Sequence, residues 1–238
     1  MLSGGKDSMY ALHWAVFHGF HVCCIASVRP RGWDSMLFHY PSVDIVPLQA
    51  KALGIPLISL SIGDDEYSGL VELFKMCKAQ GAEGVVAGAL LSDYQRLRFA
   101  MAALEAGMNI YAPLWRKSQE EYLRGLVREG FRVLVVSVQA YGLPESLVGS
   151  VLTPELVEEI VARARRYGFN PAFEGGEAET LVLDAPLFRY SIEVAGSVER
   201  LGPYHYVYKI TSARLIPKPL INTLNYVEEE APEPELSN

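Results

Sequence analysis

The chain has few cysteines and no pattern that would use them. Three cysteines occur in 238 residues, and no two of them form a CxxC pair. An odd and sparse count argues against a disulfide framework and against a zinc site. Cys23 and Cys24 lie in an apolar run that predicts a strand core, and Cys77 falls on the apolar face of a predicted helix. We therefore do not expect a catalytic thiol.

The sequence also lacks a membrane-spanning or secretory segment. No apolar stretch reaches the roughly 20 residues that a membrane-spanning helix needs. Lys6 and Asp7 interrupt the N-terminus before the apolar core of a signal peptide could build. Hydrophobic residues make up 50% of the chain and charged residues 21%, which is ordinary globular usage. We expect a folded cytoplasmic protein that does not bind membranes.

An excess of positive charge is absent as well. The net charge is −7, and residues 228–238 hold five glutamates without a lysine or arginine, so subtracting them leaves −2 for residues 1–227. A nearly neutral body does not predict bulk nucleic-acid binding. Two prolines stand among the glutamates, and residues 223–238 are predicted to be an acidic, flexible tail.

Glycines and helix caps divide the rest of the chain into alternating elements. Ser92 with Gln95 and Ser118 with Glu121 form capping boxes, and Thr153 before a proline is a further helix start. Helices are predicted over residues 8–18, 43–53, 66–80, 93–106, 118–129 and 154–167, and strands over 21–28, 56–62, 84–90, 109–114, 131–138, 179–184, 187–199 and 204–216.

This alternation predicts an α/β fold with a doubly wound parallel sheet and a smaller, mostly β region at the C-terminus. Residues 133–136 are continuously apolar, which indicates burial on both faces, as in a parallel sheet covered by helices. The last three strands look antiparallel. In helix 93–106 we expect Leu97, Met101 and Leu104 to form the core face. We expect surface positions for His13, His18 and His21.

The most informative motif is residues 3–8, with the sequence SGGKDS, which leads directly into an amphipathic helix. Two glycines let the backbone approach an anion, and the helix start adds N–H donors and a positive dipole end. Ser3, Ser8 and Lys6 add hydroxyls and a charge. The segment matches neither GxxxxGKS/T nor GxGxxG. It predicts a cradle for phosphate, and a glycine-rich turn that only caps a helix is the alternative.

Two other groups of charges suggest a ligand. Arg96 and Arg98 lie near a predicted helix start, where cations oppose the helix dipole. Arg96 therefore favours an anionic ligand over a plain surface position, and for Arg98 both interpretations stay open. Glu174, Glu177 and Glu179 crowd three carboxylates into six positions, which is costly unless a cation is near. They could bind that cation or act as a general base. A solvated acidic turn is the alternative.

The order S-G-G-x-D-S resembles the PP-loop of the ATP pyrophosphatase superfamily. Further runs narrow the resemblance to the diphthine–ammonia ligase family over roughly residues 1–220: EGGEAET at 174–180, YQRLR at 94–98, FH at 38–39 and APLW at 112–115. Tyr40 departs from the family, which often has threonine there. The superfamily has its first central strand before the loop, and only two residues precede it here, so we expect a strand upstream of Met1.

The resemblance implies a PP-loop/HUP-type fold and a reaction. ATP would activate the carboxylate of diphthine, a modified histidine on translation elongation factor 2, as an acyl-adenylate. Ammonium would supply the nitrogen, and the amide, AMP and pyrophosphate would form, with Mg²⁺ accompanying the triphosphate. No glutaminase module is visible. The implied domains are an ATP-binding domain over residues 1–150, a substrate region over 151–222 and the tail.

The resemblance also implies site residues. Lys6, Arg96 and Glu177 would be catalytic. Asp7 would hold Mg²⁺ or order the loop, and a first-turn carboxylate that complements the helix dipole is the alternative. ATP would be bound by Ser3, Gly4, Gly5, Lys6, Asp7, Ser8, Ser27 and Gly88. Substrate would be bound by His39, Tyr94, Gln95, Arg96, Arg98, Glu174, Gly175, Gly176, Glu177, Glu179 and Thr180.

Three other functions stay open. RNA thiolation by a PP-loop enzyme would require reactive cysteines or a basic surface that binds RNA. Amidation of another carboxylate would use the same mechanism. A nucleotide-binding regulator without turnover would keep the phosphate loop but would not need the acidic run.

Overall fold

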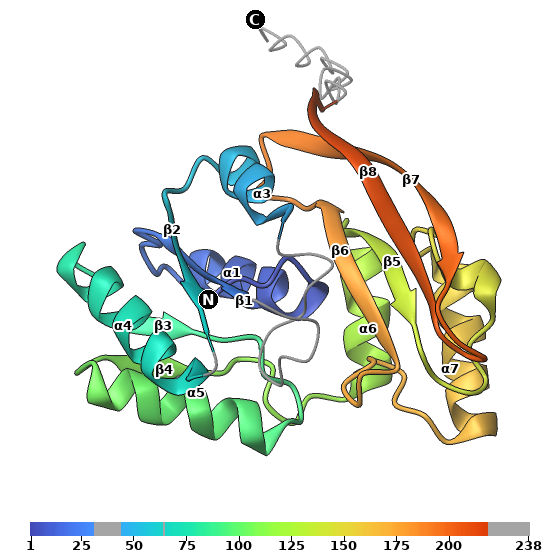
Figure 1. Cartoon of the computed structure of the whole chain (residues 1–238), viewed down its shortest axis with the longest axis horizontal. Helices are drawn as coiled ribbons and strands as arrows, with labels where there is room; N and C mark the ends of the chain where they lie inside the picture. Colours follow the sequence, from blue (N-terminus) through green and yellow to red (C-terminus); the bar gives the residue numbers. More distant parts are fainter. Residues whose placement is uncertain (31–43, 64, 219–238) are drawn as a thin grey trace, which may run out of the picture.

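The computed structural model describes residues 1–30, 44–63 and 65–218 (Figure 1). His39 and the predicted tail lie outside the described residues. The helices are α1 (Lys6–Phe17), α3 (Val46–Leu53), α4 (Glu66–Ala79), α5 (Asp93–Glu105), α6 (Gln119–Arg128) and α7 (Pro154–Tyr167), with a 3-10 turn η1 (Glu145–Leu147). The strands are β1 (Ile25–Pro30), β2 (Leu57–Ile62), β3 (Gly84–Val86), β4 (Asn109–Tyr111), β5 (Arg132–Val138), β6 (Ala178–Asp184), β7 (Tyr190–Arg200) and β8 (Tyr206–Pro217).

The predicted capping signals hold in the structure. The hydroxyls of Ser92, Ser118 and Thr153 each accept a hydrogen bond from the backbone N–H three residues later. Gly54 and Gly168 end their helices in the left-handed conformation, at φ of 69° and 79°. These local signals explain why the predicted helix boundaries agree with the structure to within a few residues.

The first half of the chain forms a parallel layer. β1 pairs with β2 from Ile25↔Leu57 onward, and β3 pairs with β4 over three residues, both in parallel. The two pairs are joined through the N-terminus, because Leu2 N–H donates to Ala26 O at 2.8 Å and the Met1 amino group donates to Val86 O at 2.9 Å. The chain therefore enters the phosphate loop from between the two pairs. The predicted α/β class with parallel strands is confirmed.

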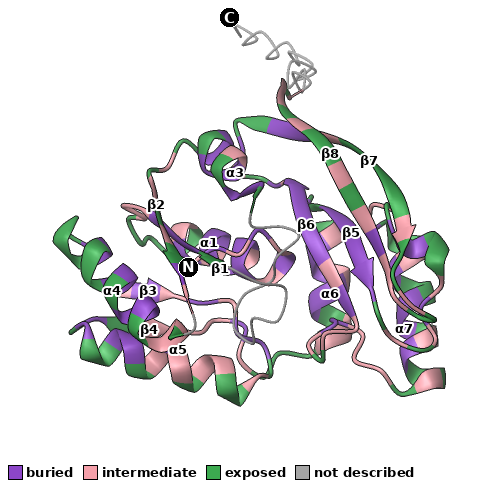
Figure 2. Ribbon diagram, viewed as in Figure 1, coloured by how far each residue is buried: buried purple, intermediate pink, exposed green. Residues whose placement is uncertain are grey.

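The second half forms a four-stranded antiparallel sheet in the order β6-β5-β8-β7. The parallel pairing expected for residues 131–138 is wrong, because β5 runs antiparallel to both β6 and β8. Burial on both faces, however, is correct: every residue of β5 after Arg132 is buried, and Figure 2 shows β5 and β6 almost wholly buried. A continuous apolar run indicates that both faces of a strand are buried. It does not indicate whether the strand pairs with its neighbours in parallel or antiparallel. The domain boundary at residue 150 stays a prediction.

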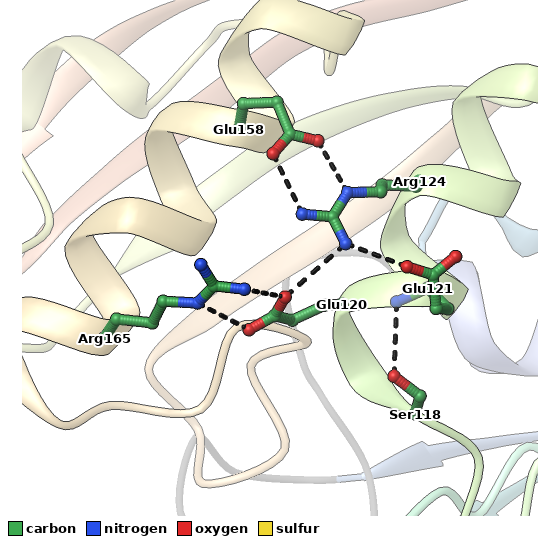
Figure 3. Close-up of polar contacts among 6 residues, drawn as sticks. All are labelled: Ser118, Glu120, Glu121, Arg124, Glu158 and Arg165. Atoms are coloured by element: carbon green, nitrogen blue, oxygen red, sulfur yellow. Dashed lines mark hydrogen bonds and ion pairs between the residues drawn. The ribbon is translucent and has the colours of Figure 1, made fainter.

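Helices α6 and α7 are joined by a network of ion pairs (Figure 3). Arg124 forms two hydrogen bonds with Glu158, at 2.6 and 2.9 Å, and a third with Glu121 at 3.0 Å. Arg165 contacts Glu120 at 3.0 Å. Exposed pairs of this kind contribute about 0.2–1 kcal/mol each. They therefore fix the orientation of α7 against α6 more than they stabilise the fold.

The core face expected for α5 is wrong. Phe99, Ala102 and Ala103 are the buried residues of the helix, whereas Leu97, Met101 and Leu104 are 49%, 56% and 78% exposed. The helix carries two apolar stripes. Phe99 and the alanines Ala102 and Ala103 face the core, which leaves the second stripe of large aliphatic side chains in solvent.

The expected surface position of His13 is also wrong, since this side chain is 2% exposed. Its Nδ1 lies 2.9 Å from Met9 O, and its Nε2 lies 3.1 Å from the backbone nitrogen of Leu187. The Leu187 N–H needs an acceptor, so Nε2 is unprotonated and Nδ1–H donates to Met9. Burial lowers the pKa of His13 to about 4. His18 and His21 are exposed, as predicted, and Cys23 and Cys24 are half-buried just before β1.

Within the described residues, no helix combines the length and the apolar character needed to span a membrane.

Candidate active site

The phosphate loop is closed by its own serines. Ser3 N–H donates to Ser8 Oγ at 3.1 Å, and that hydroxyl donates to Gly5 O at 3.1 Å. Gly4 takes a φ of +93°, which favours glycine. Gly5 is the N-cap of α1 in extended conformation and supplies no side-chain cap. The N-cap residue therefore leaves the first turn of α1 without a side-chain cap of its own, and a helix N-terminus suits an anion.

The loop is fastened to β6, which comes from the other half of the chain. Val182 N–H donates to Gly4 O at 3.0 Å, and Lys6 N–H donates to Thr180 Oγ1 at 3.2 Å. Gln49 on α3 is fully buried, and its amide donates to Gly4 O at 3.0 Å and to Val182 O at 2.8 Å. The sequence analysis missed Gln49, although an amide on an apolar helix was a usable signal.

Gly88 lets the end of the β3 segment approach α1. A Cβ atom at Gly88 would lie 2.5 Å from the Asp7 carbonyl carbon and 2.5 Å from the Ser8 nitrogen. These are backbone atoms that cannot rotate away. Glycine at this position therefore allows the close contact between strand and loop that the cleft requires.

Lys6, which is buried, and Asp7, which is half-buried, form an ion pair in the lining of the cleft. The Lys6 side chain is 3% exposed, and its Nζ lies 2.9 Å from Asp7 Oδ2 and 5.6 Å from the centre of the Phe173 ring. Asp7 Oδ1 and the Tyr122 hydroxyl are both buried, and neither has a hydrogen-bond partner among the described residues. Burial first, and then the Asp7 charge, raises the pKa of Tyr122 well above its ordinary value. Tyr122 and Phe173 are further residues that the sequence analysis missed.

Glu174 faces this pair from the acidic turn. Its Oε2 accepts a hydrogen bond from Leu91 N–H at 3.0 Å. Burial raises the pKa of Glu174, the Asp7 carboxylate raises it further, and Lys6 acts in the opposite direction. A carboxyl with a raised pKa in a cleft is typical of acid–base sites.

Glu177 organises the same turn. Its two carboxylate oxygens accept hydrogen bonds from the backbone N–H groups of Asn170 and Gly175, each at 2.8 Å. Gln139 Nε2 donates to Gly176 O at 2.7 Å and holds the turn from β5. The Glu177 carboxylate thus points into its own turn.

These elements enclose one cleft that is open to solvent. It brings together eleven of the predicted residues: Ser3, Gly5, Lys6, Asp7, Ser8, Gly88, Gln95, Glu174, Gly176, Glu179 and Thr180. The phosphate loop and the acidic turn, which lie about 170 positions apart in the sequence, therefore line the same space.

Two family models match this chain. The model described as Diphthamide synthase N-terminal domain matches residues 1–110, and the one described as Diphthamide synthase C-terminal domain matches residues 118–216. The chain belongs to the diphthamide synthase family.

Several curated relatives of this chain are named diphthine–ammonia ligase. The diphthine–ammonia ligases of Mus musculus and Homo sapiens are 32% and 30% identical over 220 residues, which is 83% of this chain and 82% of each relative. That of Schizosaccharomyces pombe is 32% identical over 212 residues, 81% of this chain and 35% of its own length. This member of the diphthamide synthase family is an ATP-dependent ligase.

A solved chain is also similar, at a greater distance. It is described as a predicted subunit of tRNA methyltransferase from Methanocaldococcus jannaschii, and it aligns over 78% of this chain and 96% of its own. The TM-score is 0.42 and the identity 14%, a likeness too distant to bear on function.

Several predicted residues of the diphthamide synthase site lie outside the cleft lining. Arg96 stacks 4.6 Å above the Trp115 ring and donates to Asp93 at 3.1 Å, and its Nε is buried without a partner among the described residues. Arg98 lies between the rings of Tyr67 and Tyr94. Ser27 is buried in β1, and Gly4 serves the loop through its carbonyl, while Glu177 and Gly175 shape the turn.

The residues present fit Mg²⁺ bound together with a triphosphate. Among residues 1–30, 44–63 and 65–218, no group of three or more His, Cys, Asp or Glu side chains is arranged to hold a metal by itself. Asp7 Oδ1, however, is buried without a hydrogen-bond partner among the described residues, and the Asp7 charge raises the pKa of Glu174. Mg²⁺ is commonly held by one or two carboxylates, with phosphate oxygens completing its shell.

Proposed function

We propose that this protein amidates the carboxylate of diphthine on translation elongation factor 2, with ammonium as the nitrogen donor and ATP as the activator. The observation that carries the proposal is the single cleft shared by the phosphate loop at residues 3–8 and the acidic turn at residues 174–180. Family membership and the name of the curated relatives support it.

The reaction runs in two displacements. A carboxylate oxygen of the substrate attacks the α-phosphorus of ATP, and pyrophosphate leaves. Ammonia then attacks the carbonyl carbon of the acyl-adenylate. AMP leaves and carries away the carboxylate oxygen that had attacked the α-phosphorus. Hydroxide is a poor leaving group and AMP a good one, so activation is what makes the amide accessible. Positioning and charge stabilisation account for most of such catalysis.

The phosphate loop is suited to hold the departing pyrophosphate. Ser3 and Ser8 offer hydroxyls, and α1 offers the positive end of its dipole. Lys6 supplies a buried positive charge, which Asp7 positions at 2.9 Å. Mg²⁺, held by Asp7 with Glu174 nearby, would supply further positive charge against the phosphates.

The acidic turn is suited to the cationic participants. Ammonium must lose a proton before it can attack, and diphthine carries a quaternary ammonium. Glu174, with its raised pKa, is the carboxylate best placed to take that proton. We assign Glu179, which lines the cleft, to the cation of the substrate. The catalytic role of Glu177 is then indirect, since its carboxylate holds the turn that carries Glu174. Arg96 lies next to Gln95, which lines the cleft, and its charge would help to orient the substrate carboxylate before activation.

Product analysis tests the proposal. The protein is mixed with Mg-ATP, ammonium and diphthine-bearing elongation factor 2, and AMP and pyrophosphate should form only with all components present. Lys6→Ala should abolish turnover, whereas Lys209→Ala, which removes an exposed lysine on β8, should not. AMP without the factor would point to another carboxylate, and ADP or no turnover would rule out adenylation.

A further inference from the structure

Helix α5 presents a stripe of large apolar side chains to solvent. Tyr94, Leu97, Met101 and Leu104 are 42%, 49%, 56% and 78% exposed. We call these four residues the α5 seam. In Figure 2 the helix lies along one edge of the molecule with its outer side uncovered. Large apolar side chains gathered on one helix face commonly mark a surface that another protein covers.

The spacing of the seam is that of a helix-pairing surface. Its residues are separated by three, four and three positions, which is the a–d alternation of a heptad. Tyr94 and Met101 then occupy a positions, and Leu97 and Leu104 occupy d positions. Arg98 and Glu105 fall at successive e positions beside the seam. In helix pairs, charges at the flanking positions choose the partner and its direction.

The charges make the seam complementary to itself. If two α5 helices pack antiparallel about a two-fold axis at Met101, Leu97 of one copy lies within one residue, about 1.5 Å along the helix, of the level of Leu104 of the other. The same axis brings Arg98 to within one residue of the level of Glu105 of the second copy, twice. Within one copy, Glu105 uses Oε2 to accept from the Tyr67 hydroxyl at 2.9 Å, and the Arg98 guanidinium lies 5.5 Å from the Tyr67 ring. Both charged groups are thus held beside the seam in advance.

We propose that the α5 seam is a homodimer interface in which two copies of this chain pack α5 antiparallel across a two-fold axis at Met101. A helix of 13 residues is about 20 Å long. An interface of that length lies at the small end of specific interfaces. The dimer is therefore concentration-dependent. The seam begins beside Gln95, which lines the cleft, so the second copy sits next to the mouth of the active site.

The first experiment measures mass against concentration. Sedimentation equilibrium of the full chain should move from 26.3 kDa towards twice that value between about 1 and 200 µM, the range of a weak complex. Met101→Glu should raise the dimer dissociation constant at least about 100-fold, because two carboxylates would meet on the axis. Leu201→Glu replaces an equally exposed leucine outside the seam and should leave the dimer intact. A wild-type monomer at every concentration, or a dimer untouched by Met101→Glu, would overturn the proposal.

The second experiment tests the antiparallel register. Arg98→Glu and Glu105→Arg should each weaken the dimer, because each sets like charges opposite one another. The double variant should restore it. Both single variants alter exposed or half-exposed side chains, so recovery in the double variant separates interface charge from misfolding. Failure of the double variant to recover would rule out this register.

Discussion

His13 gives a prediction in which the sign and the size both follow from the structure. It is 2% exposed on α1, and its unprotonated Nε2 accepts from Leu187 between β6 and β7. Protonation would place a proton on that acceptor and a charge in the core. Burial is the main cause of the lowered pKa of His13; the hydrogen bond to Met9 is the next largest influence and raises the pKa, and the neighbouring Lys218 lowers it by a smaller amount.

The pKa falls from 6.5 to about 4 on folding, so the unfolded chain binds more protons between those values. Stability must therefore fall as the pH falls through that window. Linkage gives a loss of about 2 kcal/mol between pH 7.5 and pH 5, and about 3 kcal/mol once both states are protonated. The contribution of neutral His13 is complete above the unfolded pKa.

Urea denaturation of wild type and His13→Gln at both pH values measures this loss. Carboxylates elsewhere also titrate, so the informative quantity is the difference between the two proteins. Glutamine cannot be protonated, and its amide can keep both hydrogen bonds. The wild type should lose about 2 kcal/mol more than His13→Gln between pH 7.5 and pH 5. His18→Gln, at an exposed site, should behave as wild type. An equal loss in all three proteins would refute the reasoning.

Two further substitutions test how the loop is held. Gly88→Ala should destabilise the protein by about 1–3 kcal/mol and weaken ATP binding, since its Cβ would meet backbone atoms at 2.5 Å. Gly125→Ala, where the nearest atom to the new Cβ lies 3.5 Å away, should fold normally. Thermal melts and nucleotide titration compare the two variants. Gln49→Leu should lower the free energy of unfolding, measured by urea denaturation, by about 2 kcal/mol, because it removes the donor to two buried carbonyls. Gln80→Leu, at an exposed position, should lower it little. A Gln49→Leu protein as stable as wild type would show that water replaces the amide.

Local signals in the sequence predicted local structure well. The hydroxyls of Ser92, Ser118 and Thr153 and the glycines after each helix act within a few residues, so they can be recognised without the fold. The phosphate loop has the same advantage, since its glycines and serines interact with one another.

The errors concern relations between distant segments. The direction of β5 depends on which strands flank it, and its apolar run is the same for either direction. The α5 stripes are both apolar, and only packing against α4 and the parallel layer decides which one is buried. His13 became a core residue because Leu187, 174 positions away, offers its N–H there. The family resemblance named the acidic turn, but the different duties of Glu174 and Glu177 emerged only from their contacts.

The bonds between the loop and β6 have a mechanical consequence. Many two-domain enzymes admit nucleotide by rotating one half away from the other. Here Gly4, Lys6 and Gln49 fasten the parallel half to Val182 and Thr180 at the site itself, so such a rotation would break the phosphate loop. These bonds favour movement of the two halves as one body. Another hydrogen bond, from Leu91 to Glu174, joins the two halves at the acidic turn, and we expect nucleotide and product to enter and leave on that side of the cleft.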